Sequence, residues 1–498
     1  MWQTTSVARG NEPSVVVVGS GLAGLTCAAE LAEAGCRTTV VSPGRAGRDG
    51  ATHRVHGLAP WILLTAPCSR GDSPDLFLQD LRRRGGGMGR EGLDRVLAES
   101  AHDAALRLIE ELDLERIDPG PVLLPGDEFP RGLRCLPRNR HVMLAPALAR
   151  CAADGVHLRE RTLVFGLLLR NDRAAGVVAI GRDDRDPSLV EADAVVLACG
   201  GGGAVFPVTT SPRWCRGTGL ALASAAGVML HRAGLAQVLP VTATPPLFFP
   251  SSAALLRSRI EIDGRPLGSD RDVEATTVAI AEAVRAGASV SLEPTADAVA
   301  ILPASVRASS AFRKFGRVPL TVALHHAIGG VAIDAWGRTS LAGLYACGEA
   351  AGGVQGRRRT MGTGLLEAAV FARRAAQAVV GDGRKDRPAG TGAPRPVAVC
   401  APADPARAER RLDELMGPLV LVRPGGEVEA AERELSSWSR RVFDPGSAQA
   451  PGALAGIRLE AALAMLRGFR EDRPAVEAVA PEGGHGRVDG AHERQADS

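Results

Sequence analysis

Three consecutive arginines, Arg357, Arg358 and Arg359, stand in a glycine-rich stretch that could bind an anion. The stretch follows an apolar segment, GLYACGEAAGG at 343–353, and precedes an alanine-rich segment, LLEAAVFARRAA at 365–376. A guanidinium group presents a planar fork of N–H donors that suits a carboxylate or a phosphate. The run therefore indicates either an anion-binding corner or a solvated basic patch on a surface loop, and the elements around it decide between the two.

A second glycine-rich loop, near the N-terminus, has the spacing of a dinucleotide-binding motif. Four valines, Val15–Val18, predict a strand buried on both faces, and Gly19–Gly24 fits the pattern G-x-G-x-x-G. A helix is expected over Leu25–Ala34 and a second strand over Arg37–Val41. The glycines allow a tight turn, close approach of a pyrophosphate and close packing of helix on strand. Ser42 stands where an acidic residue usually binds the ribose, which argues against a standard nicotinamide site.

Segments far apart in the chain are expected to assemble one nucleotide-binding fold. Residues 192–206 and 343–353 both run from an apolar strand into glycines, as the first motif does. Between them, short apolar runs, prolines and an amphipathic helix at Val273–Arg285 indicate an inserted domain. The expected fold class is α/β, with a Rossmann-like nucleotide-binding domain, an inserted α+β capping domain and a C-terminal helical region. The predicted boundaries are 13–230 and 321–382 for the two parts of the nucleotide-binding domain, 231–320 for the capping domain, 383–404 for a linker, 405–470 for the helical region and 471–498 for a disordered tail.

Composition and charge argue against several other classes of protein. The 498 residues are 45% hydrophobic, which suffices for two or three structural units with large cores. Lys and Arg number 59 against 56 Asp and Glu, so the net charge of +3 gives no reason to expect nucleic acid or a membrane surface as a partner. The nine cysteines contain no C-x-x-C pair, and no disulfide framework or metal site is expected. Because no signal-peptide core and no run of about 18 apolar residues is found, the cytoplasm is the expected location.

Several motifs in a fixed order carry a resemblance to a known family. They are the glycine loop at 19–24, GDSPDLFLQDLRRRGGGMG at 71–89, ADAVVLACGGGGAVFPVTTSP at 192–212, HHAIGGVAIDAWGRTSLAGLYACGEAAGG at 325–353, and LLEAAVFARRAA at 365–376. In this order they resemble the succinate dehydrogenase/fumarate reductase flavoprotein family, and within it most closely the L-aspartate oxidases. The resemblance covers roughly residues 13–380 and fades beyond them.

The resemblance implies that FAD is the cofactor and that this chain binds it noncovalently. A histidine makes the covalent link in the family's respiratory enzymes, and Ala51 stands at its place here. Thr218 and Pro43 depart from the family pattern, since an aspartate and a lysine are usual at these positions. The positions that match the family's FAD contacts are Gly19, Ser20, Gly21, Leu22, Ala23, Gly24, Ser42, Ala51, Thr52, Gly57, Val164, Glu349, Gly364 and Leu365.

The same resemblance assigns three residues to the substrate. Arg359 matches the arginine that the family places over the flavin, and His325 matches its substrate-binding histidine. Arg271 matches the arginine to which the family assigns proton exchange with substrate. Because an arginine rarely loses its proton, the residue type itself supports electrostatic activation. His326 stands where a tyrosine is usual and is expected to be structural, and the other two arginines of the run are expected to be exposed.

Other contacts that the family makes with its substrate are missing. Leu239 stands at the place of a histidine, Val241 at that of a threonine, and Ala253 and Ala254 replace a Thr/Ser-Glu pair. Each missing partner is worth about 1–3 kcal/mol when it is buried. Either the substrate differs from that of the family or the activity is weak.

Three functions remain open at this point. The first is oxidation of L-aspartate to iminoaspartate, for quinolinate and NAD biosynthesis, with oxygen or fumarate as acceptor and a possible partner enzyme of quinolinate synthesis. The second is a fumarate reductase-like dehydrogenase acting on another small carboxylate. The third is a catalytically degenerate flavin-binding protein. Retention of Arg271, Arg359 and His325 favours catalysis, whereas the missing contacts favour the last two functions.

Overall fold

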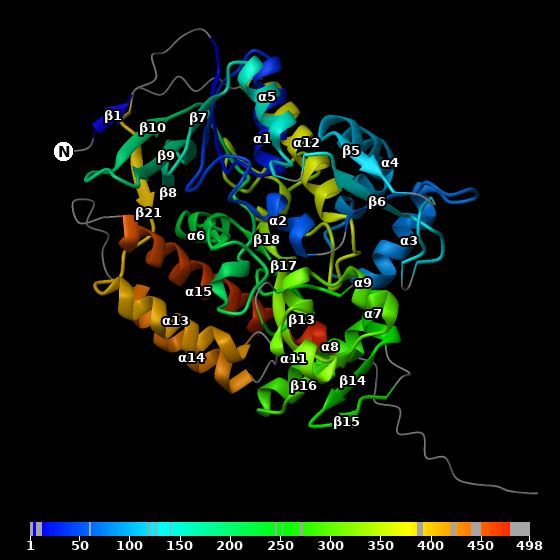
Figure 1. Cartoon of the computed structure of the whole chain (residues 1–498). Helices are drawn as coiled ribbons and strands as arrows, with labels where there is room; N and C mark the ends of the chain where they lie inside the picture. Colours follow the sequence, from blue (N-terminus) through cyan, green and yellow to red (C-terminus); the bar gives the residue numbers. More distant parts are fainter. Residues whose placement is uncertain are drawn as a thin grey trace, which may run out of the picture.

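The structure, a computed structural model of the chain, describes most of its residues (Figure 1). The described residues are 3–5, 12–58, 61–117, 120–124, 127–139, 141–244, 247–250, 252–268, 272–385, 392–419, 425–439 and 450–478. Arg271, one of the residues assigned to the substrate, lies just outside them.

A five-stranded parallel sheet forms the centre of the fold and is assembled from distant segments. Its order is β19 (Leu344–Ala346), β11 (Ala194–Leu197), β2 (Ser14–Val18), β3 (Arg37–Val41) and β7 (His157–Arg159), and every neighbouring pair is parallel. All four valines of β2 are buried, as expected for a strand covered on both faces. Helices α1 (Leu22–Glu33) and α12 (Gly364–Lys385) pack against each other beside this sheet. The expected Rossmann-like α/β class is confirmed.

A second five-stranded sheet extends the same domain. Its order is β1 (Gln3–Thr5), β10 (Ser188–Glu191), β9 (Arg173–Gly181), β8 (Thr162–Arg170) and β21 (Arg395–Ala398). The pairs are antiparallel except that of β1 with β10. Strand β21 lies inside the segment 383–404 that composition indicated as a linker, so part of that segment is regular structure.

The inserted segment carries its own sheet and core. Its strand order is β13 (Ala236–Thr242), β17 (Val318–Ala327), β16 (Val290–Glu293), β14 (Arg259–Ile262) and β15 (Arg265–Pro266), with antiparallel pairs throughout. The amphipathic helix predicted at 273–285 is α8 (Val273–Arg285), whose first turn is capped by the Asp272 carboxylate. Its buried face joins an apolar core that includes Phe248, Leu255 and Leu292. We refer to this sheet and its helices as the cap.

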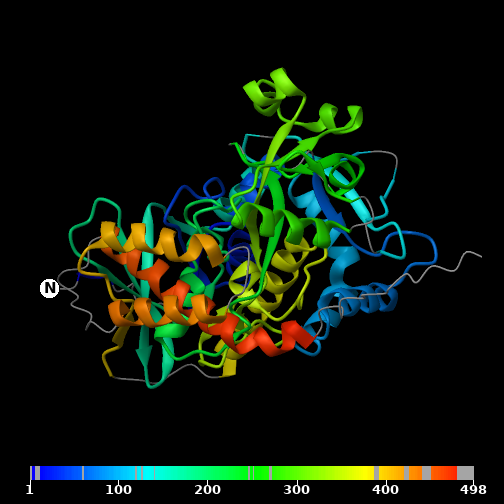
Figure 2. The same cartoon turned by 90° about the horizontal axis from the view of Figure 1, so that it is seen from below.

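Three C-terminal helices form a separate layer (Figures 1 and 2). They are α13 (Pro405–Leu419), α14 (Gly425–Ser439) and α15 (Ala450–Ala478). Helix α15 packs on α6 (Thr218–Ala225), and its buried Arg458 donates to the Val205 carbonyl at 2.9 and 3.2 Å. The C-terminal layer thereby supports the glycine-rich turn after β11. Helix α15 also continues to Ala478, into the segment 471–498 that was expected to be a disordered tail.

Shorter elements connect these layers. The remaining elements are α2 (Ala51–Leu58), β4 (Ile62–Thr65), α3 (Pro74–Gly85), α4 (Leu93–Glu111), β5 (Leu114–Arg116), β6 (Gly132–Pro137), α5 (Ala145–Ala153), η1 (Gly203–Val205), β12 (Leu230–His231), α7 (Ser252–Arg257), α9 (Ala296–Ile301), α10 (Ala304–Arg307), α11 (Ser310–Phe315), β18 (Gly330–Ala332), η2 (Gly348–Ala350) and β20 (Ala351–Gly352). Two three-stranded sheets are present among the described residues, with the strand orders β4-β6-β5 and β12-β18-β20.

Candidate active site

One cavity reaches from the first glycine loop to the histidine pair and Arg359. Its walls include the carboxyl ends of β2, β3 and β11 and the starts of α1, α2 and α12. In open α/β sheets, ligands bind at this edge, beyond the carboxyl ends of the parallel strands. The predicted residues that line it are Gly19, Ser20, Gly21, Leu22, Ala23, Ser42, Ala51, Thr52, Val164, His325, Glu349, Arg359, Gly364 and Leu365. Two further predicted residues are not among the lining residues: Gly57 lies in α2, and Gly24 lies in the first turn of α1 against the Gly19 carbonyl.

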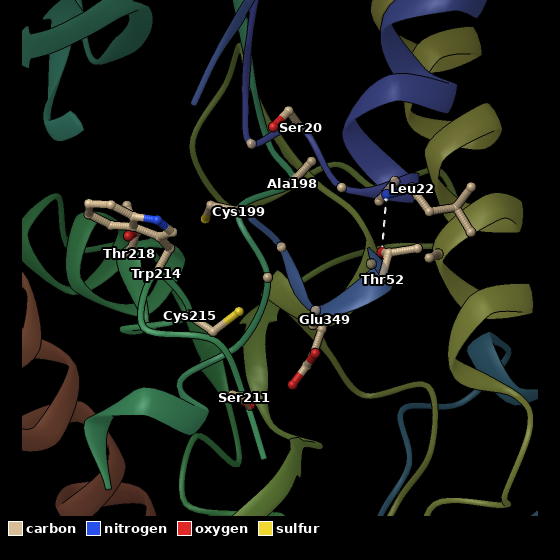
Figure 3. Close-up of a pocket in the computed structure, with 18 of the residues that line it drawn as sticks. Ser20, Leu22, Thr52, Ala198, Cys199, Ser211, Trp214, Cys215, Thr218 and Glu349 are labelled. Carbon is tan, nitrogen blue, oxygen red and sulfur yellow. Dashed lines mark hydrogen bonds between the residues drawn. The ribbon is translucent and has the colours of Figure 1, made fainter. Parts of the chain in front are cut away.

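The first glycine loop leaves the N-terminus of α1 open toward the cavity (Figure 3). Within the described chain, the N-cap residue Gly21 has no side-chain cap, and the Leu22 amide donates to Thr52 Oγ1 at 3.2 Å. A Cβ at Gly24 would lie 1.9 Å from the carbonyl oxygen of Gly19, whose own φ is +112°. Both positions therefore require glycine. The open helix terminus suits the pyrophosphate of a dinucleotide.

The cavity offers the cofactor packing surfaces and, at Cys215, a thiol that is not an activated nucleophile. Ser20 Oγ donates to Ser42 Oγ at 2.8 Å, which ties the loop to the end of β3. The Cys215 thiol points into the cavity beside the Ala51 backbone (Figure 3), and burial raises the pKa of that thiol well above its ordinary value. A protonated thiol is a poor nucleophile. Noncovalent binding, expected from Ala51, therefore stays the prediction.

A β-bulge turns two consecutive histidines into the same cavity. In the pairing of β13 with β17, Gln237 lies opposite His326, but Val238 lies opposite Leu324, so His325 is the extra residue. Consecutive residues of a regular strand point to opposite faces. Here both His325 and His326 line the cavity. The bulge thus gives His326 a place in the site, whereas the sequence indicated only a structural role.

Glu349 follows β19 and faces the histidine pair. Its Oε1 accepts from the Ala327 amide at 2.8 Å and lies 3.5 Å from His326 Nδ1. Burial raises the pKa of Glu349 to about 7, opposed by the Ala327 hydrogen bond and by Arg359. Burial, with a smaller effect of Arg359, lowers the pKa of His326 well below its ordinary value. Near neutral pH the carboxyl group of this pair titrates and the imidazole is neutral.

Arg359 is the one arginine or lysine in the described lining of the cavity. Its Nη1 donates to Gln237 Oε1 at 3.1 Å. Its Nε is buried and has no hydrogen-bond partner among the described residues. Burial lowers the pKa of the guanidinium, while Glu367 and Glu349 oppose the change, and an arginine remains charged in such a setting. This is the geometry that an anion-binding corner needs.

The other two arginines of the run do not line the cavity. The Arg358 side chain is 46% exposed and pairs with the carboxylate of Glu274 on α8. The Arg357 side chain is 14% exposed and lies 3.8 Å from the same carboxylate. Arg358 is therefore exposed as expected, whereas Arg357 is mostly buried because it packs between the loop and the cap.

His325 is held from the neighbouring loop. Its Nδ1 lies 2.9 Å from Thr210 Oγ1. Burial, together with the charge of Arg359, lowers the pKa of His325 to about 3. The imidazole is therefore neutral at physiological pH and acts as a hydrogen-bonding group. Thr210 is the middle residue of VTTSP at 208–212, and nothing in its local sequence marked it as a partner of His325.

The structure adds a buried polar cluster that sequence reasoning missed. Gln355 Nε2 donates to Glu367 Oε2 at 2.7 Å and to Thr363 Oγ1 at 3.0 Å. Burial raises the pKa of Glu367 to about 7, although Gln355 and Arg359 oppose the rise. An available signal was the position of Glu367 in LLEAAV, an acid within an apolar helix. Gln237 has no comparable signal, because its partner is more than a hundred residues away.

The positions that lack the family's polar contacts are buried and apolar. Leu239 lies opposite Ala323 in the cap sheet and is 6% exposed, and Val241 is fully buried. Ala254 is also buried. Arg271 and the side chain of Ala253 lie outside the described part of the chain.

Comparison with known proteins defines the class of this cavity and fold. The chain matches the FAD binding domain family over residues 14–265 and 267–365, which is more than half of its length. The chain belongs to this family and is a FAD-dependent oxidoreductase. The predicted cofactor, FAD, is thereby confirmed, and the open α1 terminus and glycine loop described above fit it.

Individual relatives agree with the family resemblance. The chain is 32% identical over 414 residues to an L-aspartate oxidase of Caulobacter vibrioides, covering 75% of this chain and 77% of that protein. It is 29% identical over 398 residues to one of the subunits of the fumarate reductase (CoM/CoB) of Methanothermobacter marburgensis, covering 73% and 72%. An E. coli quinol fumarate reductase has the same fold, with a TM-score of 0.75 at 16% identity over 94% of this chain and 88% of that one. Among the described residues, no helix is long and apolar enough to cross a membrane.

Proposed function

We propose that this protein oxidises a small carboxylate at its FAD, with L-aspartate as the leading substrate and iminoaspartate as the product. Oxygen or fumarate would reoxidise the flavin. The proposal is supported by relatives named L-aspartate oxidase. Iminoaspartate would be consumed by an enzyme of quinolinate synthesis on the way to NAD, and the cytoplasm is the proposed location.

The observation that carries the proposal is a buried, charged Arg359 with an unpartnered Nε in the FAD cavity. A buried guanidinium of this kind binds a carboxylate through charge-assisted hydrogen bonds. The low pKa of His325 keeps its imidazole neutral, so it orients the substrate by a hydrogen bond without adding a second positive charge. In this arrangement Arg359 fixes one end of the substrate and His325 fixes its rotation.

Bound FAD supplies a hydride acceptor, and the protein supplies position and electrostatics. Arg271, in the sequence of the inserted segment, is proposed to activate the substrate or handle its proton, on the strength of the family resemblance. Strand β17 of the cap sheet places His325 in the cavity, and Gln237 of the neighbouring β13 accepts a hydrogen bond from Arg359. Glu349, with a pKa of about 7, is proposed as the acidic FAD contact.

A second candidate is dehydrogenation, or the reverse reduction, of a less polar acid. The specific observation that favours it is the apolar character of Leu239, Val241 and Ala254, all buried at positions where the family binds a carboxylate. A substrate site bordered by these side chains would accept an apolar substituent more readily than a second carboxylate. This candidate uses the same Arg359 and the same FAD chemistry.

The test is product formation by the purified FAD-loaded protein. L-aspartate in air should give hydrogen peroxide and, after hydrolysis of the imine, oxaloacetate and ammonia in equal amounts. Fumarate in place of oxygen should give succinate. Turnover of other acids without turnover of L-aspartate would favour the second candidate, and no turnover of any small acid would contradict both.

A further inference from the structure

Gln237 accepts a hydrogen bond from one of the three guanidinium nitrogens of Arg359, Nη1. Gln237 lies in β13 opposite His326, at the edge of the bulge that opens the cap sheet. Its Oε1 accepts from Nη1 of Arg359 at 3.1 Å, across 122 residues of sequence. The side-chain amide of Gln237 is neutral, so it orients the guanidinium without cancelling its charge.

The opposite edge of the same guanidinium, made of Nε and Nη2, stays available. Nε is buried without a hydrogen-bond partner among the described residues. A Cβ at residue 364 would lie 2.3 Å from Nη2, so Gly364 makes room for this edge. An unpaired buried donor costs free energy unless a ligand or water satisfies it.

This chain uses the Nε–Nη2 edge of arginine for carboxylates elsewhere. In three other places both nitrogens donate to the two oxygens of one carboxylate, at distances of 2.7 or 2.8 Å: Arg131 with Asp72, Arg338 with Asp382, and Arg411 with Glu434. The free edge of Arg359 has the same donor geometry. A planar carboxylate is therefore the ligand that completes it.

We propose that Gln237 is a positioning residue that turns Arg359 so that its Nε–Nη2 edge receives the substrate carboxylate. The proposal rests on the proposed function, because it assumes a carboxylate substrate in the FAD cavity. Gln237 itself contacts no reacting atom in this scheme. It acts by fixing which edge of the guanidinium is free, and Gly364 keeps that edge unobstructed.

A double-mutant cycle on the FAD-loaded protein tests the proposal. Dissociation constants of L-aspartate, succinate and butyrate are measured for the wild type, Gln237→Leu, Arg359→Lys and the double variant. An acid that reduces the flavin is measured by the concentration dependence of anaerobic flavin reduction, and an acid that does not reduce it by perturbation of the flavin absorbance. Gln237→Leu should weaken binding of the best of these acids by about 10-fold or more, because the bidentate geometry is lost. In the Arg359→Lys background the same change should have little further effect, since an ammonium has no planar edge to orient.

Controls separate positioning from general damage to the fold. Gln377→Leu makes the same substitution on an exposed position of α12 and should leave binding unchanged. If the Gln237→Leu protein loses FAD, the Gln237→Glu variant is used in its place. A carboxylate at residue 237 still accepts from Arg359 Nη1 but neutralises the guanidinium, so it should also weaken anion binding by about 10-fold.

Two results would overturn the proposal while leaving the proposed function intact. One is an unchanged dissociation constant in both Gln237 variants, and the other is additive losses in the double variant, which would show that Gln237 acts independently of Arg359. In both cases Arg359→Lys alone would still weaken binding. Failure of the wild-type protein to bind any of the three acids would contradict the proposed function and this proposal with it.

Discussion

Replacing Arg359 with Lys tests whether the Arg359 guanidinium binds the substrate or only adds positive charge to the loop. The substitution keeps the charge but removes the fork, and it leaves Gln237 Oε1 with a single ammonium as its possible donor. Arg358→Lys is the matched control, because it makes the same change one residue away. The Arg358 side chain is 46% exposed and its partner is Glu274, outside the cavity lining.

The expected magnitude follows from what each arginine contacts. A charge-assisted hydrogen bond inside a buried site is worth about 1.5–3 kcal/mol, and loss of the bidentate pair at Arg359 removes at least one such bond. Each 1.36 kcal/mol corresponds to a factor of ten in rate, so flavin reduction by the best substrate should fall roughly 10²-fold. Arg358→Lys should change the rate less than about 3-fold, because exposed ion pairs contribute little.

The assay is anaerobic stopped-flow reduction of bound FAD, with flavin content measured for each variant. Retention of FAD in Arg359→Lys is part of the expectation, since the phosphate-binding loop is distant in sequence and unaltered. Equal reduction rates for the Arg359 and Arg358 variants would refute the assignment of Arg359 to the substrate. The arginine run would then be a solvated loop, and a catalytically degenerate flavin-binding protein would become the better account.

Three further results are expected. Acid precipitation should release intact FAD into the supernatant, because Ala51 offers no linking side chain, and flavin in the pellet would contradict this. L-aspartate should be turned over with a lower kcat/KM than by a relative that keeps the polar contacts missing at Leu239 and Ala254; an ordinary efficiency would show that these positions do not line the substrate site. Glu367→Gln should raise the unfolding free energy of the apoprotein at pH 8 by up to about 3 kcal/mol and hardly at pH 4.5. The folded-state pKa of Glu367 is raised to about 7, so the protonated side chain stabilises the folded state below the ordinary glutamate pKa, and this stabilisation is lost as pH rises through 7. Gln removes the cost of ionising a buried carboxyl group at high pH, and a pH-independent effect in thermal melts would refute the assignment.

The sequence predicted those elements whose structure depends on interactions between residues close together in the chain. The valines of β2 and the glycines that follow it identify a buried parallel strand and a phosphate-binding turn, because steric and dipole effects there act within a few residues. The amphipathic pattern of 273–285 likewise predicted α8 with its bounds. The apolar strand before Cys347 indicated the return of the chain to the central sheet.

The remaining features depend on contacts between distant segments. Gln237 contacts Arg359 because the pairing of β13 with β17 places the cap sheet next to the loop that carries the arginine run. No local sequence pattern connects the two residues. The bulge at His325 is set by strand register, which the sequence HHAIGG does not reveal. Glu367 is visible as an acid in an apolar helix, but its partner Gln355 is found only in the folded loop.

Anaerobic titration of the purified FAD-loaded protein with L-aspartate tests the central claim most directly. The oxidised flavin absorbance should bleach to the reduced form, with one iminoaspartate, detected as oxaloacetate and ammonia, formed for each FAD reduced. Bleaching by succinate or a less polar acid alone would keep the carboxylate chemistry and change the substrate. A flavin that stays oxidised in the presence of all these acids would contradict the claim that this cavity oxidises a carboxylate.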